Sequence, residues 1–389
     1  MPANSKTIKT AMPTNKSQLP DTQRVVITGA GWVTPLGTDL DSVWDRLVNG
    51  QSAVAPITHF DASTFATNFA AEVKNFDLGD FFDDQGLHAT AGLSTQYALA
   101  ACNNAFKQAN LDTNTIDPTR IGVYLGAGEG VLDYEPYMAA NVAAWDSESR
   151  SFNPKTWAKV AYQGMTPAPE LEQEPQLTAL HLAKRFNAQG PNLNCMTACA
   201  ASTQAIGEAT ELIRQGDADI MIAGGCHSMI HTLGITGFIR LTAMSTRRDD
   251  PTTASRPFDV SRNGFVMGEG AGIVILESLA SAKSRNATIL AEVAGFGSTA
   301  DAYRITDIHP DGQGGAGAMQ IALDQAGIDP EALDDNGKPL VQWINAHGTS
   351  TQENDKTESN AVRSVFKDNA MDVPFSSVKS MLGHLIQAA

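Results

Sequence analysis

Two patterns of apolar and polar positions alternate along the chain. Short, nearly continuous apolar runs bounded by glycine predict buried strands, and apolar residues that recur every three or four positions predict helices. The strand-forming runs lie within 24–37, 121–128, 219–225, 256–277, 288–296 and 340–345. The helical runs are 41–49, 90–110, a run that begins at or next to Cys199, and 315–326. Strands interleaved with helices predict an α/β fold with a largely parallel sheet covered on both faces, and two successive rounds suggest two similar halves.

The same pattern divides the chain into regions. Residues 1–22 are polar and lack a periodic apolar face, so we expect a disordered N-terminal tail. We place a first half at 23–285 and a second half at 286–389. Within the first half, 129–175 is rich in Trp, Tyr and Pro without a regular period, which predicts an irregular loop region at a cleft or a subunit interface.

The first candidate for chemistry is Cys199, at the end of a short run of apolar and polar residues that begins at Gly190. A segment of small residues follows, in which apolar residues recur at helical spacing from Ala201 to Ile213. We therefore expect a strand, a tight turn and a buried helix whose N-terminus lies at Cys199. The positive end of a helix dipole and its unpaired backbone N–H groups stabilise a thiolate relative to a thiol. This position predicts a nucleophilic cysteine.

The ordinary alternative for a free cysteine is that of a small buried apolar side chain. We assign that role to Cys102, which lies in a predicted helix, and to Cys226, which follows a predicted strand. A zinc site on Cys195 and Cys199 is disfavoured, because three residues separate them and no second pair of ligands at suitable spacing lies nearby. The glycines of 24–37 lack the spacing of a dinucleotide-binding loop.

Two histidines follow apolar runs in the second half. His347 comes directly after the predicted strand 340–345 and precedes Gly-Thr-Ser-Thr. His384 follows a second such run and lies five residues after Lys379. The carboxyl ends of strands are where α/β folds place working side chains, although a hydrogen-bonded structural histidine is the commoner alternative at one position. The coincidence of both histidines with a helix-capping cysteine favours a single site.

Composition narrows the possible functions. A chain of 389 residues suits one large or two closely packed domains, and 27 basic against 43 acidic residues give a net charge of −16. This balance argues against nucleic acid or an anionic membrane as the main partner, because both require a basic surface. Four cysteines without a dense framework fit a reducing compartment, and the sequence shows neither a spanning helix nor a signal-peptide core. We expect a cytoplasmic protein.

Six motifs, in order along the chain, resemble those of the β-ketoacyl-acyl carrier protein synthases, and most closely the elongating type II ketosynthases. They are Val26-Ile-Thr-Gly-Ala-Gly, Thr197-Ala-Cys-Ala-Ala-Ser, Arg256-Pro-Phe-Asp, Gly264-Phe-Val-Met-Gly-Glu-Gly-Ala-Gly, Asn345-Ala-His-Gly-Thr-Ser-Thr and Ser377-Val-Lys-Ser-Met-Leu-Gly-His. The resemblance implies a thiolase-like fold: two similar halves in α-β-α-β-α layers with mostly parallel mixed sheets. It also implies a homodimer.

The resemblance implies a decarboxylative Claisen condensation in fatty acid or polyketide elongation. Cys199 would carry the acyl group, and its backbone N–H would form half of an oxyanion hole. His347 and His384 would donate hydrogen bonds to the thioester carbonyl of malonyl-acyl carrier protein, and Lys379 would hold the histidine region electrostatically. No metal or organic cofactor is implied, since both substrates are carried on the phosphopantetheine of an acyl carrier protein.

Further positions take supporting roles from the same resemblance. Thr349 and Thr351 match residues that hydrogen-bond the pantetheine arm. Glu358 resembles the glutamate that pairs with the lysine of the site. Asp355 and Glu269 lie in matching motifs and are assigned supporting roles.

Two stretches depart from the family pattern. The loop that ends at Asp355 reads Thr-Gln-Glu-Asn-Asp where the family usually has Thr-Pro-Leu-Gly-Asp, and we expect Asn354 to take the left-handed backbone conformation of that glycine. Residues 81–90 contain no Lys or Arg, although the family often has a basic cluster there for the acidic carrier protein. Docking of the carrier protein must then use other cations, such as Arg247 and Arg248, or be weak.

The C-terminal sequence is a third departure. Family members continue after the motif at 377–384 through further strands and a Gly-Phe-Gly loop that supplies the second oxyanion donor. The half 286–389 therefore resembles a shortened version of the family's C-terminal half. We expect residues 1–389 alone to show little condensing activity.

Two other functions were weighed. A thiolase-like degradative or initiating enzyme needs a second reactive cysteine near the C-terminus, and no cysteine follows Cys226. A non-catalytic ketosynthase-like partner subunit of a heterodimer typically lacks the nucleophile, whereas Cys199, His347 and His384 are all present. The sequence favours the condensing enzyme.

Overall fold

The computed structural model describes residues 19–113, 115–128, 133–305 and 307–389, without the side chains of Leu87 and Ala89. Most of the predicted tail, 1–18, lies outside these residues. The last four residues of the predicted tail, 19–22, are described, and Asp21 among them forms an ion pair with Lys283 at 2.7 Å. Among the helices described, none combines the length and the apolar character needed to cross a membrane.

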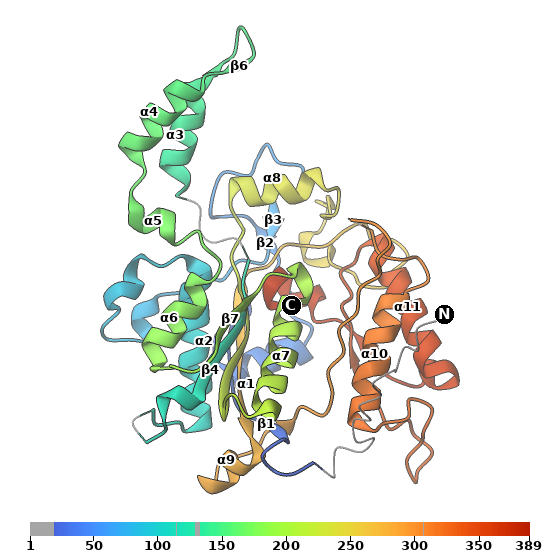
Figure 1. Cartoon of the computed structure of the whole chain (residues 1–389). Coiled ribbons are helices and arrows are strands. Elements are labelled where there is room, and N and C mark those ends of the chain that lie inside the picture. Colours follow the sequence, from blue (N-terminus) through green and yellow to red (C-terminus); the bar gives the residue numbers. More distant parts are fainter. Residues whose placement is uncertain (1–18, 114, 129–132, 306) are drawn as a thin grey trace, which may run out of the picture.

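A six-stranded sheet forms the centre of the first half, in the order β10-β1-β9-β8-β4-β7. Its strands are β1 (Val25–Val33), β4 (Ile121–Gly126), β7 (Asn192–Cys195), β8 (Ile220–His227), β9 (Gly270–Ser278) and β10 (Ala291–Glu292). β4 runs parallel to β7 and β8, whereas the pairs β8–β9, β9–β1 and β1–β10 are antiparallel. Fewer strand pairs are thus parallel than the alternation of strands and helices predicted. The reason is that α8 (Thr232–Arg240), between β8 and β9, lies beyond the end of the sheet instead of crossing its face (Figure 1).

Helices cover both faces of this sheet. α2 (Leu93–Ala109) packs against β1, β9 and β8, with α6 (Leu177–Phe186) beside it, and α7 (Ala201–Gln215) packs against β4 and β8 on the opposite face (Figure 1). Close approach of α2 depends on glycine, because a Cβ at Gly29 or Gly31 of β1 would overlap the backbone of the helix. The apolar spacing of 90–110 therefore predicted this helix and its buried face correctly.

The second half adds two further layers outside α7. The ring of Phe296, in the segment 294–298, packs onto Gly207 of α7. On the other side of that segment, Gly295 and Gly297 contact the backbone of α10 (Gln313–Ala326). Helix, sheet and helix are thus followed by a segment that forms no strand and then by α10, so an irregular segment occupies the place of the second β layer.

Two predicted strands of the second half are much shorter than expected. Only Ala291–Glu292 of the predicted strand 288–296 and only Ile344–Asn345 (β11) of 340–345 form ladder pairs, the latter in parallel with β12 (Phe375–Ser376). The apolar runs predicted longer strands, but the flanking residues add only single backbone hydrogen bonds. The N–H groups of Leu290 and Val293 donate to the carbonyls of Ile27 and Val25, both at 2.9 Å, and the N–H of Leu340 donates to the carbonyl of Ala332 at 3.1 Å. The other elements of this half are α9 (Leu279–Ser284), α11 (Gln352–Phe366) and α12 (Lys379–Leu382).

The predicted loop region 129–175 is wrong for the residues described there. They form α3 (Tyr134–Ala144), a hairpin of β5 (Trp145–Asp146) and β6 (Ser151–Phe152), α4 (Pro154–Gly164) and α5 (Pro167–Leu171). α3 and α4 project from the body of the molecule (Figure 1). The prolines suggested loops, but Pro154 and Pro167 occupy the first turns of helices, where their missing N–H costs nothing. The remaining elements are α1 (Leu40–Val48) and the pair β2 (Ala55–Pro56) and β3 (Phe69–Ala70).

Candidate active site

Cys199 lies on a tight turn between β7 and α7, as the sequence predicted. β7 ends at Cys195, and a short 3₁₀ turn, Ala198–Ala200, leads into the buried helix. Ala198 has φ 49°, a left-handed conformation that is uncommon for a residue with a side chain. Gly126 of β4 leaves space for this turn, because a Cβ there would lie 2.6 Å from the carbonyl carbon of Ala201. The strained turn and the small neighbour place the thiol at the start of α7.

The structure brings three of the predicted residues together from both halves. The Nε2 atom of His384 lies 3.0 Å from the Sγ atom of Cys199. Ligand atoms of Cys199, His347 and His384 all lie within 4.8 Å of one another. The two imidazole rings meet edge to face, with their centroids 5.4 Å apart and an interplanar angle of 84°. One sulfur therefore faces two imidazoles.

Backbone hydrogen bonds fix the orientation and the tautomer of His384. The N–H of Ile386 donates to its Nδ1 atom at 3.2 Å, so the ring hydrogen belongs on Nε2, which points at Cys199. The backbone of His384 is held by Val266, whose carbonyl accepts at 2.7 Å, and by Gly268, whose N–H donates at 2.9 Å. His384 therefore presents an N–H donor to the space beside the sulfur.

Burial dominates the electrostatics of the site. It lowers the pKa of His347 to about 3, with a smaller contribution from the charge of Lys379. Burial likewise lowers the pKa of His384 well below its usual value, and the pKa of Lys379 is lowered by burial too. Both imidazoles are thus neutral at pH 7, so each carries a single ring N–H and no charge.

The thiol of Cys199 differs from the expectation. Burial raises the pKa of Cys199, and the opposing effects of Lys379 and of the backbone N–H of Cys199 are smaller. The start of a helix was expected to favour the thiolate, but desolvation of the sulfur outweighs that effect. The resting group is therefore a thiol at neutral pH.

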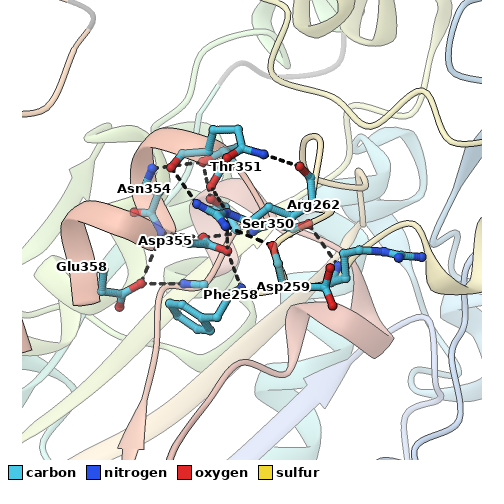
Figure 2. Close-up of polar contacts among 12 residues, drawn as sticks. Phe258, Asp259, Arg262, Ser350, Thr351, Asn354, Asp355 and Glu358 are labelled. Atoms are coloured by element: carbon cyan, nitrogen blue, oxygen red, sulfur yellow. Dashed lines mark hydrogen bonds and ion pairs between the residues drawn. The ribbon is translucent and has the colours of Figure 1, made fainter. Parts of the chain in front are cut away.

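Glu358 holds the backbone of the His347 loop instead of pairing directly with Lys379. Its carboxylate accepts from the N–H of His347 at 2.6 Å and from the N–H of Gly348 at 2.8 Å. Asn354 adds a third donor at 3.2 Å (Figure 2). Glu358 acts on Lys379 only through its charge, which raises the pKa of the lysine. The carboxylate thus positions the loop, and the predicted pair is corrected to this arrangement.

Asp355 joins the two halves beside the same loop (Figure 2). It is fully buried and accepts from the N–H of Phe258 at 2.7 Å and of Ser350 at 3.1 Å. Arg262, which the sequence interpretation missed, places its Nε atom 3.5 Å from the carboxylate and also donates to the carbonyl of Thr351. The sequence offered no signal that singles out Arg262, because 256–277 also contains Arg256, Asp259, Glu269 and Glu277.

The loop between His347 and α11 does not use Asn354 as its left-handed residue. Asn354 lies in α11, whereas Gly348 (φ 43°) and Ser350 (φ 69°) take the left-handed conformation. The hydroxyls of Thr349 and Thr351 lie 2.9 Å apart, and Thr351 caps α11 by accepting from the N–H of Asn354 at 3.3 Å. The two threonines therefore form one polar pair at the start of the helix.

Glu269 lies outside the group formed by Cys199 and the histidines. It is completely buried and accepts from Nε2 of His59 at 2.8 Å, from the N–H of Val73 at 3.0 Å and from the hydroxyl of Ser228 at 3.0 Å. The hydrogen bond to Glu269 raises the pKa of His59. Glu269 follows directly after Gly268, which holds His384, so its bonds stabilise that segment.

An apolar cluster flanks Cys199, and the two predicted docking arginines lie nearby in the chain. The cluster consists of buried residues that pack with the partly buried Cys199: Ile57, Ala62, Ala70, Ile230, Ile235, Met244, Phe265, Met267 and Ile386.

The two arginines predicted to dock the carrier protein bond to backbone carbonyls. Arg247 donates to the carbonyl of Ser261, and Arg248 donates to the carbonyls of Phe65 and Ala66. Both arginines are therefore tied to the backbone near this cluster.

The side chains of Cys199, His347 and His384 also lie close enough together to hold a metal ion, so a metal site is the alternative to a reacting thiol. Metal binding needs a lone pair on the histidine nitrogen that faces the metal. His384 instead directs its Nε2 hydrogen toward the sulfur, because Nδ1 accepts from Ile386. The ammonium of Lys379, whose charge is felt by all three side chains, repels a second cation. The arrangement favours donors around a reacting thiol.

Comparison with known proteins agrees with this geometry. Two family models match: "Beta-ketoacyl synthase, N-terminal domain" over residues 22–282 and "Beta-ketoacyl synthase, C-terminal domain" over residues 290–389. The chain is 40% identical over 366 residues to a 3-oxoacyl-[acyl-carrier-protein] synthase 2 of Staphylococcus aureus (strain COL), covering 94% of this chain and 82% of that protein. A protein of the same name from Coxiella burnetii is 39% identical over 368 residues, covering 94% and 83%.

Solved structures show the same similarity. A β-ketoacyl synthase from Burkholderia phymatum STM815 superposes with a TM-score of 0.79 at 32% identity, covering 94% of this chain and 83% of that one. A type II PKS acyl-carrier protein in complex with its ketosynthase, bound to the hexaketide, gives a TM-score of 0.78 at 32% identity, with the same coverage.

Proposed function

This chain belongs to the β-ketoacyl synthase family, and on that premise we propose that Cys199, His347 and His384 carry out its reaction. The reaction is the decarboxylative condensation of an acyl group with malonyl-acyl carrier protein, in fatty acid or polyketide elongation. The observation that carries the assignment of residues is the contact between the Cys199 sulfur and the Nε2–H of His384, with His347 beside both.

Acyl transfer to Cys199 is the first step. The sulfur attacks the thioester carbonyl, a new carbon–sulfur bond forms, and the bond to the pantetheine sulfur breaks. The proton of the Cys199 thiol passes to the departing pantetheine thiol, so the step is neutral overall. The apolar cluster beside Cys199 supports this role, because it offers an acyl chain an environment without water.

Decarboxylation and condensation follow. The bond between the malonyl carboxylate and its neighbouring carbon breaks, carbon dioxide leaves, and the electron pair forms an enolate at the thioester oxygen. The neutral imidazoles of His347 and His384 donate to that oxygen as its charge develops. The carbon then attacks the acyl group on Cys199, and the sulfur leaves and takes a proton from solvent. Thr349 and Thr351, next to His347, offer hydroxyls to the pantetheine arm.

Substitution of His384 tests the assignment. We expect His384→Ala to reduce carbon dioxide release from a malonyl thioester by about 100-fold, the size expected when one donor to an oxyanion is removed. Acylation of Cys199, followed by mass spectrometry, should fall by no more than about tenfold. His309→Ala, a half-buried histidine of the second half that forms no part of the site, is the matched control. Equal loss of both half-reactions in His384→Ala would contradict the proposed role.

The alternative of a non-catalytic partner subunit is disfavoured by the same geometry. Such a subunit has no use for a sulfur held 3.0 Å from an imidazole N–H. Acylation of Cys199 in the isolated protein separates the two functions, since a partner subunit without chemistry would remain unlabelled by acyl thioester.

The assembly we propose is a homodimer with β7 at its interface. β7 is an edge strand of the large sheet, and Leu193 and Met196 are 41% and 62% exposed. Edge strands with exposed apolar side chains are prone to pair with a second chain. Light scattering should give twice the chain mass of 41.2 kDa, and Leu193→Lys should lower it. Leu333→Lys, at a leucine of similar exposure in the second half, should not. A monomer at micromolar concentration would refute the dimer.

We also propose a cytoplasmic location. All four cysteines are free, which supports a reducing environment. Fractionation of the source cells would test this location, and recovery in a membrane or extracellular fraction would contradict it.

A further inference from the structure

His227, a buried histidine outside the site, bonds to the segment that follows His384. His227 is the last residue of β8, and Gln387 lies in the 3₁₀ turn Ile386–Ala388. Nδ1 of His227 lies 2.5 Å from Oε1 of Gln387, and the two residues are only 3% and 6% exposed. An amide oxygen can only accept, so Nδ1 of His227 carries a hydrogen and donates it.

The surroundings of Gln387 are shaped around its side chain and backbone. A Cβ at Gly128 would overlap the side-chain amide of Gln387, and a Cβ at Gly225 of β8 would overlap its carbonyl oxygen. The turn thus lies directly against β8, with Gln387 packed closely against Gly128 and Gly225. We name the pair of His227 and Gln387 the anchor.

The residue before Gln387 carries the hydrogen bond that sets the tautomer of His384. The N–H of Ile386 donates to Nδ1 of His384 at 3.2 Å, and Ile386 has φ 40°. A β-branched residue takes this left-handed conformation only where its surroundings impose it. The anchor, one residue further along, supplies such a constraint.

His227 also reaches the other segment that holds His384. Its Nε2 atom lies 3.4 Å from Sδ of Met267. Met267 forms a parallel bridge with His384, and its neighbours Val266 and Gly268 bond the backbone of His384. The two backbone segments that fix His384 therefore meet at the ring of His227.

We propose that His227 and Gln387 are positioning residues for the condensation, which hold the Ile386 N–H against His384 so that its Nε2–H faces the reacting centre. This inference rests on the proposed function. Loss of the anchor frees His384 to exchange tautomers, and the tautomer with hydrogen on Nδ1 has no donor for the enolate oxygen. Decarboxylation should suffer more than acyl transfer. The sequence signal, a histidine at the carboxyl end of a buried strand, is the one that identified His347.

Three variants test the anchor in the full chain. His227→Leu removes the donor, and Gln387→Met removes the acceptor while keeping most of the volume. His227→Asn retains an amide donor near the position of Nδ1. With malonyl-CoA and acyl-CoA as probes, we expect the first two variants to lower carbon dioxide release about tenfold and Cys199 acylation by no more than about twofold. His227→Asn should recover most of the lost rate. If His227→Leu does not fold, Gln387→Met decides the question.

A spectroscopic measurement tests the same proposal without substrate. In ¹⁵N-histidine-labelled protein, His384 should show a protonated Nε2 and an unprotonated Nδ1, identified by comparison with His384→Gln. Gln387→Met should show a mixture of both tautomers at His384. An unchanged tautomer, or equal loss of both half-reactions, would overturn the proposal and leave the anchor a packing role only. If the unsubstituted enzyme releases no carbon dioxide, the proposed function fails, while the tautomer still tests the anchor.

Discussion

At the scale of single residues, burial and local charge act against each other on Cys199. Desolvation raises the pKa of its thiol, and the nearby ammonium of Lys379 lowers it by a smaller amount. The thiolate is the nucleophile, so its population rises with pH up to the raised pKa. Lys379 is itself buried, and its charge lowers the pKa of the Cys199 thiol.

Alkylation by iodoacetamide tests this balance. We expect the rate at Cys199 to rise with pH from neutrality and to keep rising beyond the ordinary pKa of a cysteine. Lys379→Met should slow labelling at fixed pH, because removal of a positive charge raises the pKa of the thiol further. Cys102 and Cys226 should stay unlabelled, since both are fully buried and burial raises the pKa of Cys226 to about 12. Mass spectrometry locates the adduct, and even labelling of all cysteines would contradict an accessible nucleophile at Cys199.

Single residues also show which features of the site the sequence can predict and which it cannot. Cys199 and His347 could be found because each lies where a strand or helix ends, a position that apolar periodicity reveals. The direction of the thiol pKa shift could not, because it depends on burial by segments distant in sequence, such as 266–268 and 384–386. The tautomer of His384 depends on one backbone N–H and leaves no sequence pattern.

At the scale of elements, periodicity succeeded for helices, whose backbone hydrogen bonds lie within the element, and failed for strands, which need a neighbouring strand. The helices at 41–49 and 315–326 appear within two residues of the predicted ends. The strands predicted at 288–296 and 340–345 form ladder pairs over only two residues each, since an apolar run does not specify its neighbour. In 129–175, prolines that begin helices were mistaken for loop signals.

The packing between α7 and the segment 294–298 gives a prediction at this scale. Glycine is a poor helix former, so replacing it with alanine ordinarily stabilises a helix by about 1 kcal/mol. At Gly207, however, the new Cβ would overlap the ring of Phe296, and overpacking of this kind costs roughly 1–3 kcal/mol. We therefore expect Gly207→Ala to lower the free energy of unfolding, measured in urea.

The control is the same substitution in another helix. At Gly237 of α8, no atom of the described residues lies within 4 Å of the place that a Cβ would occupy, so Gly237→Ala should raise the free energy of unfolding by about 0.5–1 kcal/mol. Adding Phe296→Leu to Gly207→Ala should recover part of the loss, which a double-mutant cycle measures. Equal effects at both glycines would show that α7 and Phe296 are not in close contact.

At the scale of the whole molecule, the two halves meet next to the reacting centre at a set of polar contacts between residues 256–264 and 347–355, which we name the joint. The motif 256–264 of the first half meets the loop 347–355 of the second, where the N–H of Gly264 donates to the carbonyl of Ser350 at 2.9 Å. The loop that carries His347 therefore depends on residues of both halves for its shape (Figure 2). These contacts help to hold the loop of His347 opposite Cys199.

Substitution of Asp355 measures the strength of that joint. Asp355→Ala leaves the N–H groups of Phe258 and Ser350 without their acceptor and removes the carboxylate that faces Arg262, which is itself only 12% exposed. Removing one partner of a buried ion pair typically costs about 3–5 kcal/mol. We expect a fall of this size in the free energy of unfolding, together with faster amide exchange at Phe258 and Ser350.

The control is Asp259→Ala, at an exposed carboxylate of the same motif that bonds the neighbouring Ser261. This substitution should lower the free energy of unfolding by no more than about 1 kcal/mol. Similar losses for both variants would mean that the halves are held together elsewhere, and that the position of His347 does not depend on Asp355.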